Sequence, residues 1–115
     1  MKKTLLILLL SAINISAQQD YKLIEKIQYY SSEVANSDDY INERCVLDVY
    51  FPTNKKEFAT IVWFHGGGLR TGEKEIPESL KEKGVGIIGV NYRLYPNISA
   101  PAYIEDAAAA VAWVF

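Results

Sequence analysis

The stretch T-I-V-W-F-H-G-G-G, residues 60–68, joins an uncharged hydrophobic segment to a run of glycines. Residues 60–64 are β-branched or aromatic, a pattern typical of a strand covered on both faces in a parallel sheet. Three consecutive glycines at 66–68 lose much backbone freedom on folding, so the fold must need their conformations. The stretch therefore indicates an α/β sheet with a specialised loop at the end of one strand.

The glycine run has three physical explanations. Phosphate binding is disfavoured, because the run fits neither G-x-G-x-x-G nor G-x-x-x-x-G-K-[ST]. A plain turn stays open, although a single glycine is enough for most turns. The third explanation is an oxyanion hole, in which closely approaching backbone N–H groups stabilise the negative oxygen of acyl transfer. We favour this third explanation.

Further strands are predicted on either side of this stretch. Residues 45–51 alternate between two faces, which indicates a half-covered strand, and residues 85–91 form a second buried strand. A short alternating patch at 27–30 predicts a first strand. Residues 31–42 are rich in Ser, Asn and Asp and are expected to form a loop.

Two helices complete the expected α/β order. A short helix should begin near Pro77 and end before Gly84. A longer one should begin at Pro101, with its apolar stripe packed on the sheet. The residues of that stripe are Ile104, Ala107, Ala108, Val111 and Phe115.

The N-terminus resembles a secretory signal peptide. Lys2 and Lys3 precede an apolar run that starts at Leu5, and small residues follow at a cleavage spacing. The apolar run is shorter than the ~20 residues that a membrane span needs. We expect residues 1–19 to be a leader cleaved after Ala17 or Gln19, and the mature protein to be periplasmic or secreted.

Composition narrows the classes of partner. Half of the residues are hydrophobic and the formal net charge is −2, so the chain is expected to be globular, without a basic surface for nucleic acid. Cys45 is the single cysteine, which excludes an internal disulfide. Its place in an alternating apolar stretch favours a buried thiol over a nucleophile.

Several motifs together resemble the N-terminal part of an α/β-hydrolase carboxylesterase. The closest groups are the hormone-sensitive-lipase-like and the bacterial feruloyl- and acetylxylan-type serine esterases. The resemblance covers residues 45–115 and implies an incomplete α/β-hydrolase fold, with a mostly parallel sheet and flanking helices, preceded by a strand and loop region at 20–44. The motifs are Leu47–Pro52, Val62–Gly68, Asn91–Leu94, Pro101-Ala102 and Glu105-Asp106, with Ala109, Ala110 and Trp113.

The resemblance implies a role for each residue of the glycine motif. Gly67 and Gly68 would donate the N–H groups of the oxyanion hole, and Gly66 would shape the turn. His65 would be structural, because the catalytic histidine of this fold comes late in the chain. Arg93 and Asp106 are expected to form a buried ion pair that ties a loop to the last helix; two separately solvated charges are the alternative.

The resemblance also implies the substrate, a small-molecule or carbohydrate-linked carboxylic ester, with no metal or other cofactor. A catalytic triad is missing: no serine lies in G-x-S-x-G, and His65 is the single histidine. The last helix also lacks a C-cap. We therefore expect these 115 residues to be a truncated stretch of a longer esterase, inactive alone. A prolyl-oligopeptidase-type peptidase and a non-catalytic secreted protein remain as alternatives.

Overall fold

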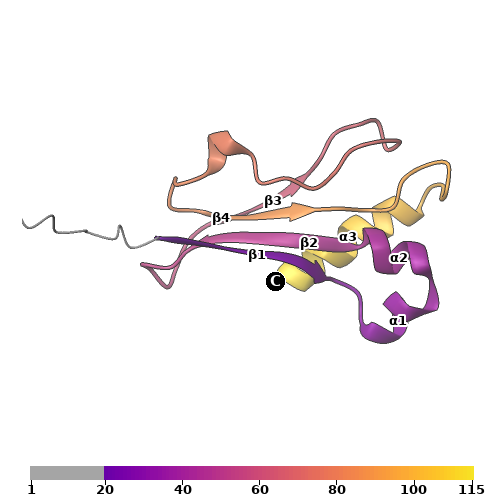
Figure 1. The fold of residues 1–115 in the computed structure, drawn as a ribbon, viewed down its shortest axis with the longest axis horizontal. Coiled ribbons are helices and arrows are strands. Elements are labelled where there is room, and N and C mark those ends of the chain that lie inside the picture. The colour runs from indigo at the N-terminus through magenta and orange to yellow at the C-terminus, as the bar shows by residue number, and fades with distance from the viewer. Residues whose placement is uncertain (1–19) are drawn as a thin grey trace, which may run out of the picture.

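The computed structural model describes residues 20–115, and the expected leader at 1–19 lies outside this part. Four strands form one sheet in the order β1-β2-β4-β3, with helices beside it (Figure 1). The bounds of the strands are Tyr21–Gln28 for β1, Val46–Pro52 for β2, Thr60–Phe64 for β3 and Gly86–Val90 for β4.

The sheet is mixed within this part of the chain. β3 and β4 pair in parallel, as predicted for the two apolar strands. β1 with β2, and β2 with β4, pair antiparallel, so the sheet described here is less parallel than the resemblance implied. β4 is buried along its whole length, because it lies between β2 and β3 in the sheet.

Two short helices replace the loop that was expected at residues 31–42. They are α1 (Ser32–Ser37) and α2 (Asp39–Arg44). The polar residues that suggested a loop are helix caps: Ser31 Oγ accepts from the Val34 N–H at 3.3 Å, and Asp38 Oδ1 from the Tyr40 N–H at 2.8 Å. The loop prediction was wrong because Ser and Asp favour helix N-caps as much as turns.

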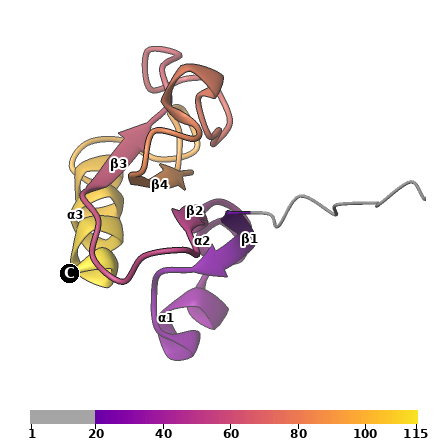
Figure 2. The same ribbon diagram turned by 90° about the vertical axis from the view of Figure 1, so that its left-hand side faces the viewer.

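The helix expected near Pro77 is only a single 3₁₀ turn, η1 (Glu78–Leu80). A segment this short gains too few backbone hydrogen bonds to offset the cost of starting an α-helix. The final helix, α3 (Ala102–Val114), is present as predicted and lies along one face of the sheet (Figure 2).

The face that α3 turns to the sheet differs from the predicted stripe. Asp106 and Ala110 are buried, whereas the side chains of Ile104 and Phe115 are 62% and 86% exposed. Alanines occur all round this helix, so its apolar pattern did not distinguish the inner face. A polar residue, Asp106, sets the orientation instead, through contacts described below.

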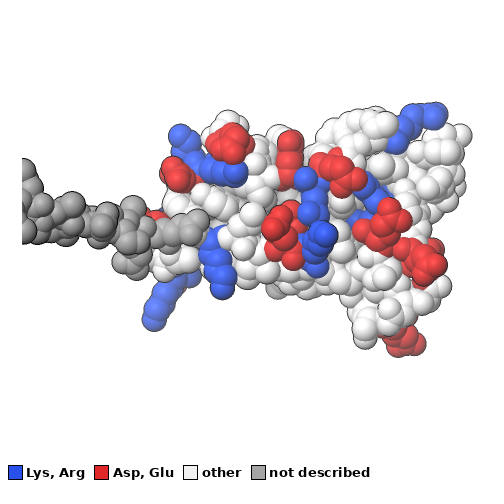
Figure 3. Space-filling view, in the orientation of Figure 1, with Lys and Arg blue, Asp and Glu red and all other residues white. Residues whose placement is uncertain are grey.

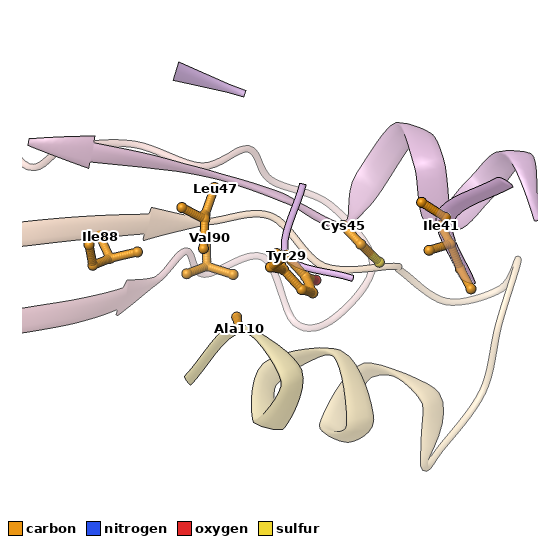
Figure 4. Close-up of a cluster of buried hydrophobic side chains, with 8 residues drawn as sticks. Tyr29, Ile41, Cys45, Leu47, Ile88, Val90 and Ala110 are labelled. Atoms are coloured by element: carbon orange, nitrogen blue, oxygen red, sulfur yellow. The ribbon is translucent and has the colours of Figure 1, made fainter. Parts of the chain in front are cut away.

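The hydrophobic core lies between the sheet and α3 (Figure 4). Cys45 is fully buried in it, which confirms the prediction of a buried thiol, and burial raises the pKa of this thiol to about 12. No helix within residues 20–115 is long and apolar enough to cross a membrane. The core residues are Tyr29, Ala35, Ile41, Cys45, Leu47, Ile88, Val90 and Ala110.

Candidate active site

The glycine loop follows directly on β3 and runs from His65 to Gly72. Gly67 has φ +121°, and the Arg70 and Thr71 N–H groups both donate to its carbonyl at 3.2 Å. A Cβ on Gly67 would lie 2.0 Å from the Thr71 carbonyl oxygen. A side chain at this position is therefore incompatible with the turn, which explains the glycine.

Several amide groups of the loop make no hydrogen bond within residues 20–115: those of Gly66, Gly67, Gly68, Leu69 and Gly72. The N–H groups of Gly67 and Gly68 make no hydrogen bond with any other part of residues 20–115. Both glycines are exposed, and no side chain would meet a Cβ on Gly68 within 4 Å. The loop thus offers adjacent backbone donors, those of Gly67 and Gly68 among them, to an acceptor arriving from outside it.

His65 is buried and supports the start of the loop. Its ring stacks on Tyr92 with a centroid distance of 4.5 Å, and its backbone oxygen accepts from the Tyr92 hydroxyl at 2.8 Å. Nδ1 lies 2.7 Å from the Gly66 carbonyl oxygen, and since a carbonyl only accepts, Nδ1 carries the proton. These contacts give His65 the geometry of a structural residue. Its Nε2 is buried without a hydrogen-bond partner in the described chain.

Gly72 closes the loop, and the sequence analysis missed it. Its φ is +115°, and a Cβ there would lie 2.2 Å from His65 Nδ1 and 2.4 Å from the Gly66 oxygen. Only glycine lets the end of the loop pass this close to its beginning. A lone glycine four residues after the run was the available signal, but it is also an ordinary turn signal.

Arg93 and Asp106 form a bidentate ion pair between the segment after β4 and helix α3. Arg93 donates from Nε to Oδ2 at 2.9 Å and from Nη2 to Oδ1 at 2.8 Å. The Arg93 backbone N–H adds a bond to Oδ2 at 3.1 Å, and the Tyr30 hydroxyl donates to Oδ1 at 2.9 Å. These four bonds hold the fully buried carboxylate and fix α3 on the sheet.

The hydrogen bonds of Arg93 and Asp106 keep both side chains ionised. Burial acts to raise the pKa of Asp106, but hydrogen bonds from Arg93 and Tyr30 outweigh it and hold the pKa below its ordinary value. The hydrogen bonds to Asp106 in turn raise the pKa of Arg93. Asp106 is therefore an anchoring carboxylate, without a role as a proton donor near neutral pH.

The lowered pKa of Asp106 predicts a loss of stability in acid. Such a carboxyl contributes stability that is complete above its ordinary pKa of 3.8 and is lost as the pH falls through the lower folded value. We expect the difference in unfolding free energy between wild type and Asp106→Asn to shrink from about pH 4 downward. Denaturant unfolding of both proteins between about pH 2 and pH 7 measures this difference in free energy. A difference that stays constant down to about pH 2 would contradict the assignment.

The sheet order, the glycine loop at the end of β3 and the helix on one face are those of the N-terminal part of an α/β-hydrolase domain. The model of the BD-FAE family matches residues 47–115, and the chain belongs to that family. The match begins at the second residue of β2, so β1, α1 and α2 lie outside it.

Named proteins with similar sequences are esterases and related enzymes. The chain is 32% identical over 69 residues to the carboxylic ester hydrolase LipN of Mycobacterium tuberculosis, covering 56% of this chain and 18% of that protein. It is 35% identical over 74 residues to the esterase LipI of the same organism, covering 57% and 23%. Tuliposide A-converting enzyme 2 of Tulipa gesneriana is 34% identical over 95 residues, covering 71% and 25%. The chain therefore spans about a quarter or less of these relatives.

Solved structures share the fold. Esterase B from Lactobacillus rhamnosis superposes with a TM-score of 0.64 at 24% identity, over 84% of this chain and 30% of that one. A truncated form of a carbohydrate esterase from gut microbiota gives a TM-score of 0.61 at 24% identity, over 85% and 34%. These likenesses establish the α/β-hydrolase architecture of residues 20–115.

Proposed function

We propose that this chain supplies the oxyanion-hole part of a carboxylic ester hydrolase. The observation that carries the proposal is the loop at the end of β3, where Gly67 and Gly68 take positive φ and their exposed N–H groups make no hydrogen bond within residues 20–115. Relatives named as a carboxylic ester hydrolase and an esterase support the assignment.

The proposed mechanism assigns the loop one electrostatic task. A serine from sequence that follows residue 115 in the complete protein attacks the ester carbonyl, after a histidine accepts its proton. The carbonyl oxygen becomes negative, and the N–H groups of Gly67 and Gly68 stabilise it where the charge develops. Residues 1–115 then lack the nucleophile and are inactive alone.

The proposed substrates are small-molecule or carbohydrate-linked carboxylic esters. The carbohydrate esterase with the same fold and the tuliposide A-converting enzymes support this range by their names. Hydrolysis by a serine nucleophile needs only water as co-reactant, so the proposal includes no metal or other cofactor. It includes no nucleic acid partner either.

Hydrolysis assays on the complete protein test this function. We expect release of p-nitrophenol from p-nitrophenyl acetate or butyrate, and no activity from residues 1–115 expressed alone. A prolyl-peptide p-nitroanilide, assayed in parallel, tests the peptidase alternative. Cleavage of the anilide without cleavage of the esters would replace the esterase by a peptidase, and inactivity toward both would reject a hydrolase.

We also propose that residues 1–19 direct export and are removed, which places the mature protein in the periplasm or outside the cell. The support is the charged, apolar and small-residue order of this segment. Mass spectrometry of the protein from its native host should find an N-terminus at residue 18 or 20. Recovery of the intact leader on cytoplasmic protein would contradict export.

A further inference from the structure

The guanidinium of Arg44 lies where the glycine loop ends. Arg44 is the last residue of α2, and only 7% of its surface is exposed. Its Nη2 donates to the Gly72 carbonyl and its Nε to the Tyr92 carbonyl, each at 3.2 Å. Its Nη1 forms an ion pair with the Glu73 carboxylate. One side chain thus contacts two segments that meet at the loop, residues 72–73 and Tyr92.

Asn91 secures the same segment from the end of β4. Its Nδ2 donates to Glu73 Oε2 at 2.7 Å, and its Oδ1 accepts from the Lys74 N–H at 2.6 Å. The Asn91 hydrogen bond is the main reason that the pKa of Glu73 is lowered, with Arg44 adding to it. Glu73 is therefore bound by both Arg44 and Asn91, and Asn91 also binds the backbone of Lys74.

These contacts connect both ends of the loop to Tyr92. The loop begins at His65, whose ring and backbone oxygen rest on the Tyr92 side chain. It ends at Gly72, whose carbonyl shares the Arg44 guanidinium with the Tyr92 carbonyl. Arg44 therefore holds Gly72, at the end of the loop, close to Tyr92, which supports His65 at its beginning.

The charges around Arg44 are matched and do not indicate a ligand. A hollow of about 470 Å³ opens here, but Arg44 pairs with Glu73, and Lys74 pairs with Asp48 at 2.6 Å. Positive and negative side chains also lie next to each other on the face that Figure 3 shows. A site for a charged ligand would carry an excess of one sign. The cluster is thus a clamp within the chain.

We propose that Arg44 is a positioning residue for the oxyanion hole, holding Gly67 and Gly68 in place through Gly72, Glu73 and Tyr92. The inference rests on the proposed function, and it adds a residue that lies before the family match at 47–115. The N-terminal region 20–44 then contributes to catalysis through one side chain. Arginine is required because its planar fork reaches three acceptors, whereas the lysine ammonium acts as a single point charge.

The test compares Arg44→Lys with Lys81→Gln in the complete protein. Lys81 forms an exposed ion pair with Glu78 on η1, away from the loop, so its replacement controls for the loss of a basic side chain's contacts. We expect Arg44→Lys to lower kcat for a p-nitrophenyl ester between about tenfold and about a hundredfold, with KM changed less than about threefold. Lys81→Gln should leave both constants within about twofold of wild type.

Amide hydrogen exchange gives a readout that is independent of activity. In Arg44→Lys, the amides of Arg70 and Thr71, which donate to the Gly67 carbonyl, should exchange at least about tenfold faster, while β2 and β4 keep their protection. Glu73→Gln should give a smaller change in the same residues, because its amide still accepts from Arg44 or Asn91. Faster exchange throughout the sheet would show a general structural role and overturn the inference, as would unchanged exchange at Arg70 and Thr71.

The two proposals fail in different ways. A wild-type protein that hydrolyses no ester rejects the proposed function, and the exchange of the Arg70 and Thr71 amides still decides whether Arg44 positions the loop. An active wild type with unchanged kcat in Arg44→Lys rejects the positioning role alone.

Discussion

Replacement of Asp106 by asparagine should lower the free energy of unfolding by about 3–5 kcal/mol. The carboxylate is fully buried and holds the Arg93 guanidinium by two side-chain hydrogen bonds. Asparagine keeps the shape but removes the charge, and Arg93 remains with Asp38 as its other acidic neighbour, at 3.9 Å. A buried charge without a close counter-ion is costly, so we expect a large loss. Denaturant unfolding of the complete protein measures it.

Glu105→Gln is the matched control for this variant. Glu105 is the adjacent residue on α3, and its carboxylate is exposed in the first turn. Its replacement should cost less than about 1 kcal/mol, the range of a favourable charge near a helix N-terminus. Equal losses in the two variants would show that the ion pair is not what fixes α3 on the sheet.

Replacement of Gly67 by alanine should reduce kcat for ester hydrolysis by about 10²–10³-fold. The added Cβ would meet the Thr71 carbonyl oxygen at 2.0 Å in a backbone with φ +121°. The turn must open to relieve this contact, which moves the Gly67 and Gly68 N–H groups from the reacting oxygen. Steady-state kinetics on a p-nitrophenyl ester measure the loss, and unfolding experiments confirm that the variant is folded.

Gly66→Ala is the matched comparison within the same loop. No atom lies within 4 Å of a Cβ at Gly66, and its φ is not in the left-handed region. The same added methyl group should therefore reduce kcat less than about tenfold. A loss at Gly66 as large as the loss at Gly67 would contradict the geometry assigned to the turn.

The strands β2, β3 and β4 were the most predictable part of this fold, whereas β1 (Tyr21–Gln28) shares only residues 27 and 28 with the first strand predicted at 27–30. The apolar run at residues 60–64 coincides with β3, and residues 85–91 contain β4, because continuous apolar residues favour strands of a parallel sheet. β4 is buried throughout as expected, whereas β3 lies at the edge of the described sheet and is only partly buried, with Trp63 exposed. The helices at α1 and α2 were missed, since Ser31 and Asp38 suit turns and caps alike. The inner face of α3 was also missed, because an ion pair and not its apolar pattern sets it.

The candidate site was predictable only where the backbone itself is unusual. The glycine run identified Gly67 and Gly68, and the resemblance paired Arg93 with Asp106, a pair that the structure contains. Gly72 and Arg44 were not found, because their roles depend on contacts with His65 and Tyr92. Arg44 is separated from Gly72 by 28 positions, and no local pattern indicates such a contact.

The oxyanion-hole role of Gly67 and Gly68 is tested most directly by a structure of the complete protein inhibited by an alkylphosphonate ester. This inhibitor leaves a tetrahedral adduct on the nucleophile. We expect a phosphonyl oxygen to lie about 2.7–3.1 Å from the backbone nitrogens of both Gly67 and Gly68. An adduct whose oxygens are held entirely by other groups, with the 65–72 loop turned away, would contradict it.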